Sequence, residues 1–203
     1  MSALTPSMDG SLHAPRVLAD VIPGARVRDA VLVLAGAAAT GIAAQISFTI
    51  PSISPVPYTM QTFAVLLVGA SFGLVRGVLS MTLYVAAGLA GVPWFADGVS
   101  GFDAAKATMG YLVGFIVAAA VLGWLSQRGN DRRVMSSVTE MFLATLVIYA
   151  IGVPVLMAVL DLGIAKGLEF GVYPFVVTDT VKLLAAAGLL PLAWRLVERV
   201  KRG

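Results

Sequence analysis

The chain has 203 residues, of which 59% are hydrophobic and only 12% are charged. Soluble domains carry about 25% charged residues, so this composition and the long uncharged runs place the chain in a lipid bilayer. The net charge is +3, but the basic residues stand at the ends of apolar runs, which excludes a nucleic-acid-binding surface.

Residues 1–29 are polar and interrupted by proline and glycine, so they are predicted to form a cytoplasmic tail with a short interfacial segment. They lack the basic and apolar regions of a cleavable signal peptide. The sole histidine, His13, belongs to this tail, and the chain has no cysteine. We therefore expect no disulfide, no metal site and no metal cofactor.

Six apolar runs follow the tail and predict six transmembrane helices. By their apolar pattern they cover about residues 30–48, 58–75, 77–91, 108–126, 135–160 and 174–197. Two irregular segments separate some of them: residues 49–57 contain three prolines, and residues 92–107 mix glycine with aromatic side chains. The predicted fold class is an all-α membrane protein, a six-helix bundle that occupies residues 30–203 as one domain.

The placement of charge predicts the orientation of this bundle. In a six-span arrangement, eleven of the fourteen basic residues fall on one side of the membrane. Lys106 and Lys166 fall on the other side, and Lys182 lies inside a span. Basic residues favour the cytoplasmic side, so both termini are predicted to be cytoplasmic.

Two charges stand inside the last apolar run. Asp179 and Lys182 are three residues apart, which places them on the same helix face. A charge within a span costs roughly 2.5–3.5 kcal/mol on insertion scales, so such residues mark a functional site by default. The alternative is an internal ion pair that ties helices together, although a buried pair stabilises a protein only weakly.

Other polar and aromatic side chains share the outer half of the membrane with this pair. Along a helix that rises about 1.5 Å per residue, Asp179 lies about 7 Å and Lys182 about 12 Å from the outer end. The other candidates at comparable depth, or in the outer loop 92–107, are Thr59, Gln61, Tyr84, Trp94, Phe95, Tyr111 and Tyr149. These residues predict a ligand pocket that opens to the exterior, with a cation for an anionic group, polar groups for a polar head and aromatic rings for an apolar body. Polar side chains also join helices, and interfacial tyrosines also anchor proteins in membranes, so these readings stay open.

The first predicted helix carries a different pattern. Ala35, Ala39 and Ala43 recur every four residues, and small residues at this spacing let another helix approach closely. The pattern is consistent with packing inside the bundle and with docking of a separate membrane partner.

The sequence contains no recognisable motif for nucleotide binding or catalysis. There is no phosphate-binding loop of the Gly-x-x-x-x-Gly-Lys-Ser/Thr type, no Gly-x-Ser-x-Gly nucleophile motif and no evident repeat of the secondary-transporter kind. The predicted pocket therefore captures a ligand, and no catalytic residue is expected.

Five segments resemble one known family, the biotin-specific S component (BioY) of energy-coupling-factor (ECF) vitamin importers. They are VPYTMQTF at Val56–Phe63, Arg76-Gly77, YVAAGLAGVPWF at Tyr84–Phe95, GYLVGF at Gly110–Phe115, and DTVK at Asp179–Lys182. The resemblance runs from about residue 30 to the last helix, in the spacing typical of the family. The chain departs from the family pattern before Tyr111 and before Asp179, where the usual Pro-Thr-Gly-Gly-Tyr and Pro-Gly are replaced.

This resemblance implies six helices and a biotin pocket near the outer face, with Asp179 and Lys182 contributing to the ligand site. It also implies a transmembrane T subunit and two ABC-type ATPases on other chains, with ATP bound by those partners. In the family, small residues of the first helix pack on the T subunit, which assigns that contact to Ala35, Ala39 and Ala43. The expected location is the bacterial inner membrane, crossed several times. Biotin is the transported ligand, and no other cofactor is expected.

Three other functions remain as alternatives at this point. An S component for a different vitamin would use the same fold, and a channel or solo secondary carrier would transport without ATPases. An intramembrane enzyme would use Asp179 as an acid or base, but no second carboxylate, histidine or cysteine is available beside it.

Overall fold

The computed structural model describes residues 16–22, 24 and 26–202, so His13 and most of the predicted tail lie outside the described residues. The chain folds almost entirely into helices. The α-helices are α1 (Arg26–Gln45), α2 (Gln61–Phe72), α3 (Leu74–Leu89), α4 (Phe102–Ala105), α5 (Met109–Ser126), α6 (Val134–Leu160), α7 (Ile164–Gly171) and α8 (Val176–Arg202). Short 3₁₀ helices are η1 (Leu18–Val21), η2 (Ala96–Gly98), η3 (Lys106–Thr108), η4 (Asn130–Arg132) and η5 (Tyr173–Phe175). Two strands, β1 (Ser47–Phe48) and β2 (Tyr58–Thr59), pair antiparallel.

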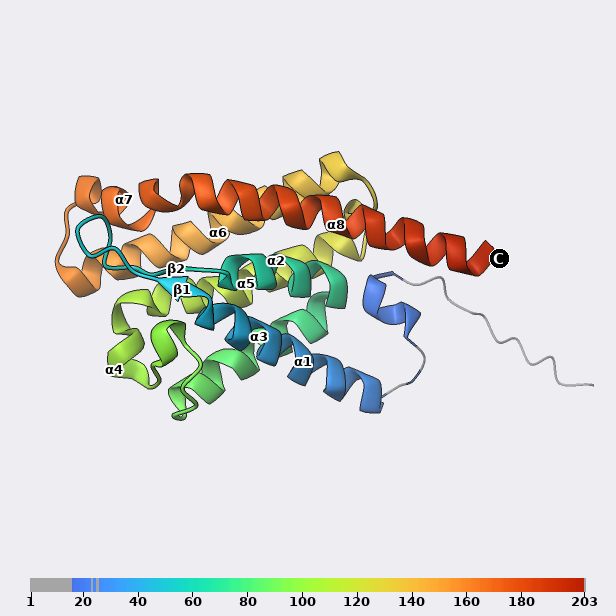
Figure 1. Ribbon diagram of the computed structural model, residues 1–203, viewed down its shortest axis with the longest axis horizontal. Coiled ribbons are helices and arrows are strands. Elements are labelled where there is room, and N and C mark those ends of the chain that lie inside the picture. Colours follow the sequence, from blue (N-terminus) through green and yellow to red (C-terminus); the bar gives the residue numbers. More distant parts are fainter. Residues whose placement is uncertain (1–15, 23, 25, 203) are drawn as a thin grey trace, which may run out of the picture.

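The long helices lie side by side and form a bundle with two distinct ends (Figure 1). The hairpin end, named after the β1–β2 pair, also carries α4 and α7. The terminal end carries η1, the junction between α2 and α3, the turn between α5 and α6, and the last turns of α8. The core between the ends is apolar and is built mainly from α2, α3, α5, α6 and α8.

Several helices have the length and composition of membrane spans. Among the described residues, four helical segments qualify, namely Arg26–Gln45, Phe102–Ser126, Val134–Leu160 and Ile164–Lys201. The apolar helices α2 and α3 are shorter, with 12 and 16 residues. Large apolar side chains such as Val31, Phe142 and Leu184 are exposed on the outer surface, as expected where helices face lipid.

The segments predicted as loops contain more structure than the sequence suggests. Residues 92–107 hold η2, α4 and the start of η3, and residues 161–173 hold the eight-residue helix α7. Residues 49–57 are irregular, as predicted. The predicted helices 30–48 and 58–75 were wrong at the ends beside this loop, because Ser47–Phe48 and Tyr58–Thr59 pair as β1 and β2 and close the loop at its base. These short elements gather at the hairpin end.

Glycines bring three of the helices close together at the terminal end. Gly73 separates α2 from α3 with a φ of 80°, a left-handed conformation that favours glycine. Gly123 of α5 packs directly against this junction, so that a Cβ atom at position 123 would lie 2.3 Å from the backbone nitrogen of Leu74. The missing side chain is therefore what allows α5 to reach the α2–α3 junction.

The first long helix has two faces. Its buried face includes Gly36, which packs against Ser80, and Gly41, which packs against the ring of Trp94. Ala35 and Ala39 are exposed on the other side, and Ala43 is half-buried. The stripe of small residues predicted from the sequence is thus distinct from the face that packs on α3.

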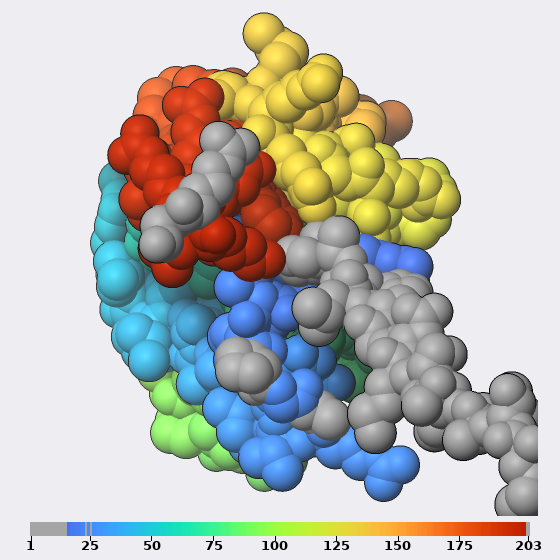
Figure 2. All heavy atoms as spheres, turned by 90° about the vertical axis from the view of Figure 1, so that its right-hand side faces the viewer, coloured from blue at the N-terminus to red at the C-terminus, as the bar shows by residue number. Residues whose placement is uncertain are grey.

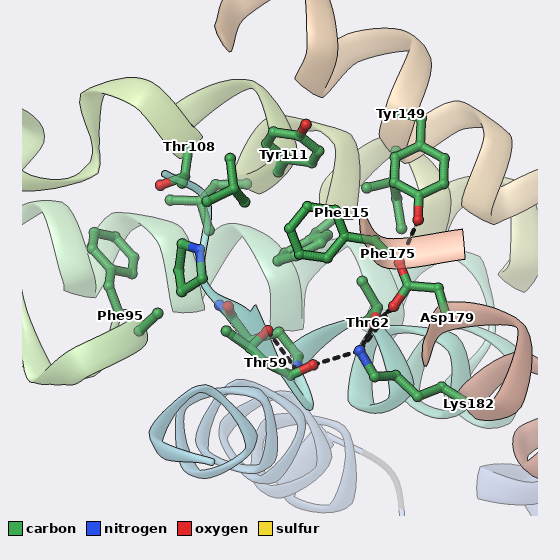
Figure 3. A pocket seen from close by; sticks show the side chains of 16 residues that line it. Thr59, Thr62, Phe95, Thr108, Tyr111, Phe115, Tyr149, Phe175, Asp179 and Lys182 are labelled. Carbon is green, nitrogen blue, oxygen red and sulfur yellow. Dashed lines mark hydrogen bonds and ion pairs between the residues drawn. The ribbon is translucent and has the colours of Figure 1, made fainter. Parts of the chain in front are cut away.

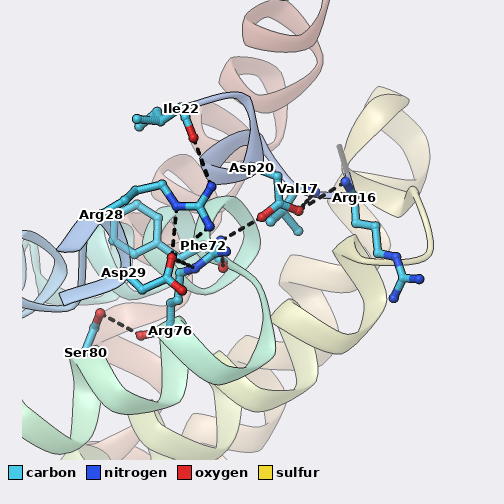
Figure 4. Close-up of polar contacts among 9 residues, drawn as sticks. All are labelled: Arg16, Val17, Asp20, Ile22, Arg28, Asp29, Phe72, Arg76 and Ser80. Atoms are coloured by element: carbon cyan, nitrogen blue, oxygen red, sulfur yellow. Dashed lines mark hydrogen bonds and ion pairs between the residues drawn. The ribbon is translucent and has the colours of Figure 1, made fainter. Parts of the chain in front are cut away.

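Arg76 of α3 ties the segment before α1 to the bundle (Figure 4). Its Nη1 lies 2.9 Å from Asp20 Oδ1, and its Nε lies 3.0 Å from Asp29 Oδ1. Arg28 shares the Asp29 carboxylate at 2.9 Å. Val17, directly before η1, is buried, so this short segment is a packed part of the terminal end.

Candidate functional site

A cavity lies between the helices at the hairpin end (Figure 3). It contains about 610 Å³ of space outside protein atoms, including the part open to solvent. The start of α2, the loop before η2, α5, the middle of α6 and the start of α8 all contribute to its wall. The lining residues are Val56, Pro57, Thr59, Gln61, Thr62, Phe95, Ala96, Thr108, Tyr111, Leu112, Phe115, Ile148, Tyr149, Phe175, Asp179 and Lys182.

The Lys182 ammonium lies at one wall of this cavity and has three partners. Its Nζ donates to the Thr59 carbonyl at 2.6 Å, to Asp179 Oδ1 at 2.8 Å and to Thr62 Oγ1 at 3.2 Å. An ammonium has three N–H donors, so these contacts use all of them. The side chains of Lys182 and Asp179 are only 11% and 7% exposed, and a pair this buried needs such complete hydrogen bonding.

The Asp179 carboxylate joins three helices. Besides Lys182 from its own helix α8, it accepts the Thr62 hydroxyl of α2 at 3.1 Å on Oδ1. Its Oδ2 accepts the Tyr149 hydroxyl of α6 at 2.6 Å. The Asp179 carboxylate therefore keeps two hydrogen-bond donors from other helices even when the Lys182 ammonium moves away from it.

The Gln61 side chain is held in place by Tyr84, which in turn hydrogen-bonds with Trp94. Its Nε2 donates to the Tyr84 hydroxyl at 2.6 Å, and that hydroxyl lies 3.3 Å from the carbonyl of Trp94, to which it donates. The Trp94 indole N–H returns a hydrogen bond to the Tyr84 carbonyl at 3.0 Å, and the two rings lie 5.4 Å apart. This arrangement fixes the Gln61 amide, which keeps one N–H and its carbonyl for other partners.

Aromatic side chains form the apolar part of the wall. Phe95, Phe115 and Phe175 line the cavity and are almost fully buried. Tyr111 lines it as well, and its hydroxyl donates to the Gly171 carbonyl at 2.9 Å, which ties α5 to the end of α7. These rings offer a large apolar surface with few polar groups, the usual composition of a small-molecule site.

The loop that carries Phe95 and Ala96 is fastened to β1. Asp97 follows directly, with a φ of 59°, and its Oδ1 accepts the Ser47 hydroxyl at 2.8 Å. Its backbone N–H donates back to Ser47 Oγ at 3.2 Å, and its Oδ2 accepts the Thr49 hydroxyl at 3.3 Å. Ser47 thus helps hold one side of the cavity wall in place.

Most of the predicted site residues come together here. Asp179, Lys182, Gln61, Thr59, Tyr111, Tyr149 and Phe95 all line the cavity. Tyr84 and Trp94 do not line it and act through Gln61 instead. Thr62 was not predicted: it lies in the first turn of α2, where its hydroxyl accepts from Lys182 and donates to Asp179.

The arrangement is suited to binding rather than catalysis. It offers a lysine for an anionic group, a fixed amide for a polar head and aromatic surface for an apolar body. Within the part of the chain that the structure describes, no group of three or more His, Cys, Asp and Glu residues is placed to hold a metal ion.

A solved structure shares this fold. The crystal structure of the S-component for biotin from an ECF-type ABC transporter superposes with a TM-score of 0.72 and 17% sequence identity. The alignment covers 87% of this chain and 92% of that chain. The fold is therefore that of an ECF S component.

The sequence comparisons give the family. The family model described as the BioY family matches residues 14–199. A probable biotin transporter BioY of Pyrococcus horikoshii is 37% identical over 163 residues, which are 79% of this chain and 93% of the relative. A probable biotin transporter BioY of Lysinibacillus sphaericus is 32% identical over 131 residues, and the match spans 64% of this chain and 65% of the relative. The chain belongs to the BioY family, whose members are named transporters and not enzymes.

Proposed function

We propose that this protein is the biotin-binding substrate-specificity component of a membrane vitamin importer. The observation that carries the proposal is the buried Lys182–Asp179 pair at the wall of a largely aromatic cavity, in a chain of the BioY family. Biotin has a carboxylate, a polar ureido ring and an apolar thiophane ring with an alkyl chain, which match the three kinds of group in this cavity.

Lys182 is the residue that meets the biotin carboxylate. Its ammonium can exchange the Thr59 carbonyl for a ligand oxygen, because a carboxylate is the stronger acceptor for a charged donor. If the ammonium turns away from Asp179, the Asp179 carboxylate still accepts from Thr62 and Tyr149. Asp179 therefore positions Lys182, while its own hydrogen bonds come from two neighbouring helices.

Gln61 is the residue best placed to read the ureido ring. The Tyr84 hydroxyl fixes its amide, which leaves a donor and an acceptor for the ureido carbonyl and N–H groups. Asn130, the sole asparagine of the chain, lies at the terminal end, and Gln61 is the one carboxamide among the described lining residues. Thr59 supplies a further polar group, and Phe95, Phe115, Phe175 and the ring of Tyr111 supply the apolar wall.

The proposed topology has six membrane spans, with α2 and α3 crossing as the two shorter helices. Both termini lie in the cytoplasm, which puts the hairpin end and its cavity on the outer side of a bacterial inner membrane. The distribution of basic residues supports this orientation, since Arg76 lies in the first turn of α3 and Arg128 and Arg132 lie in the turn between α5 and α6, all at the terminal end. Biotin is then captured from outside and delivered inward.

The energy for transport comes from other chains. The described helices include no ATP-binding loop, and the proposed partners are a transmembrane T subunit and two ABC-type ATPases. The exposed stripe of Ala35 and Ala39, with half-buried Ala43, is the proposed contact with the T subunit, because small side chains let a partner helix approach closely.

Binding of radiolabelled biotin to the purified protein tests this function. Saturable binding with a Kd below about 1 µM is expected, and a panel of other vitamins should compete poorly. Absence of such binding, or stronger binding of a different vitamin, would contradict the proposal. Proteoliposomes with this chain alone test the need for partners, since uptake without ATPases would identify a solo carrier.

Replacing Tyr149 with phenylalanine should weaken biotin binding roughly tenfold, because Asp179 loses a charge-assisted hydrogen bond and holds Lys182 more tightly. Isothermal titration calorimetry measures the effect. Tyr173→Phe is the matched control, since that side chain is 63% exposed and lies away from the cavity wall. A loss of similar size in both variants would rule out a specific role for the Tyr149 hydroxyl.

Replacing Ser47 with alanine should speed the release of bound biotin roughly fivefold, because two hydrogen bonds that hold the Asp97 loop are lost. Stopped-flow displacement of a fluorescent biotin analogue measures this rate. Ser52→Ala is the control, since Ser52 is exposed in the neighbouring loop. An unchanged rate in Ser47→Ala would show that this loop does not limit release.

A further inference from the structure

A hollow with a strong positive charge lies at the terminal end, far from the cavity described above. It is lined by Arg16, Arg128, Arg132 and Arg133, and we call it the arginine hollow. The other described residues of the lining include Ser136 and Thr139 but no acidic side chain. Figure 2 looks onto this end and shows the α5–α6 region in yellow beside the last turns of α8 in red.

None of the acidic residues that the structure describes near this end lines the hollow. Asp131 and Glu140 are both fully buried and do not line it. Asp131 Oδ2 accepts the Trp194 indole N–H at 2.5 Å, and burial raises the pKa of the Asp131 carboxyl, an effect that the Trp194 bond and the nearby Arg132 charge partly oppose. Among the described residues, the wall of the hollow therefore holds four arginines and no carboxylate.

Two of these arginines are positioned by tryptophan rings. The Arg128 guanidinium lies 3.3 Å from the centre of the Trp124 ring, and Arg132 lies 4.5 Å from that of Trp194. Arg128 Nη1 also donates to the Trp124 carbonyl at 3.1 Å, which uses one of its five N–H donors. The first turn of α6 also borders the hollow, and its N-cap residue Arg133 makes no side-chain capping bond, so the positive end of the helix dipole adds to the charge.

Exposed apolar faces of two helices continue from the hollow toward the membrane. On α5, exposed Trp124 and Val117 lie seven residues apart on one outward face, and Arg128 in the turn that follows lies over the Trp124 ring. On α6, exposed Met135 borders the hollow, and exposed Phe142 and Leu146 follow on the same face. A ligand with a phosphate and long apolar chains matches both the arginine hollow and the apolar helix faces. An acidic protein segment matches the arginine hollow alone.

We propose that the arginine hollow binds the phosphate headgroup of an anionic phospholipid, whose acyl chains lie along the outward faces of α5 and α6. Guanidinium groups are well suited to phosphate because they donate paired hydrogen bonds, and basic hollows at the cytoplasmic side of membrane helices favour such lipids. This site is independent of the cavity at the hairpin end and of any ligand bound there.

Native mass spectrometry of the delipidated, detergent-purified full chain tests the proposal. Dioleoyl phosphatidylglycerol is titrated against dioleoyl phosphatidylcholine, which has the same acyl chains but no net charge. Bound phosphatidylglycerol is expected to exceed phosphatidylcholine at least about tenfold. The triple variant R128Q/R132Q/R133Q should lose roughly 100-fold in phosphatidylglycerol affinity, at about fivefold per basic residue near a charged lipid.

The matched control is R195Q/R199Q/K201Q, which removes the same charge from exposed positions of α8 that do not line the hollow. It should change the affinity less than about threefold. If the triple variant does not fold, R133Q alone keeps both tryptophan contacts and should lose roughly fivefold against R195Q. Equal losses in hollow and control variants, or no preference for phosphatidylglycerol in the native chain, would overturn the site. If inorganic phosphate or glycerol 3-phosphate competes as well as phosphatidylglycerol, the hollow binds a free phosphate group, and the proposal of a lipid ligand is overturned.

Discussion

Replacement of Lys182 with alanine is expected to weaken biotin binding roughly 100-fold, the largest effect of any single side chain in the cavity. The variant removes the cation for the ligand carboxylate. It also leaves Asp179 as a buried carboxylate with only the Thr62 and Tyr149 hydroxyls as donors, so a second anion nearby becomes still less favourable. Titration calorimetry of wild type and variant gives the ratio of dissociation constants.

Biotin methyl ester separates these two causes. The ester carries no charge, so it should lose much less affinity than biotin does when Lys182 is replaced. Equal losses for acid and ester would show that Lys182 does not read the carboxylate. Lys166→Ala is the matched control, since Lys166 lies at the same end of the bundle but is 56% exposed and pairs with Glu169. This variant should bind biotin within about twofold of wild type.

Replacement of Gly123 with alanine should destabilise the folded protein by about 3 kcal/mol, at the upper end of the cost of overpacking. The added Cβ would meet Gly73 and Leu74 at 2.3–2.5 Å, and all of these contacts are backbone atoms that no side-chain rotation can relieve. The α5 helix would have to move away from the α2–α3 junction. Thermal unfolding in detergent, followed by circular dichroism, measures the loss.

Gly188→Ala controls for the general effect of alanine in a membrane helix. Gly188 lies in α8, and no heavy atom lies within 4 Å of a Cβ built there. Alanine favours helix formation over glycine by up to about 1 kcal/mol, so this variant should be as stable as wild type or slightly more stable. Similar melting temperatures for Gly123→Ala and Gly188→Ala would mean that α5 does not depend on close contact at the junction.

The helical architecture follows from the sequence because runs of apolar residues are long and end at charges, prolines or glycines. The predicted 135–160 helix is observed as Val134–Leu160, and the predicted 108–126 helix as Met109–Ser126. The short helices within residues 92–107 and 161–173 were not predicted. They are too short to show a clear period and owe their stability to packing at the hairpin end.

The sequence predicts how far along its helix each candidate side chain lies, but not the direction in which that side chain points. Sequence position along a span gives the height of Tyr84 and Gln61, but packing against neighbouring helices decides which of them turns toward the cavity. Tyr84 is fully buried behind Gln61, because its ring packs at a tilt against Trp94, whose ring covers Gly41 of α1. Thr62 was missed for a related reason: a threonine in an apolar helix gives no signal until its partners Lys182 and Asp179 are seen beside it.

The Asp179 carboxylate accepts hydrogen bonds from α2, α6 and α8 at once. It therefore couples the arrangement of these helices to the affinity for a ligand at Lys182. Any partner that displaces α2 relative to α8 must stretch the bonds of this carboxylate and so alter the place of Lys182. The affinity for a ligand at Lys182 then changes with the arrangement of the helices. Thermodynamic linkage requires the reverse as well: a bound ligand changes the affinity for that partner by the same factor. A single acidic side chain can therefore report occupancy of the cavity to the outer surface of the bundle.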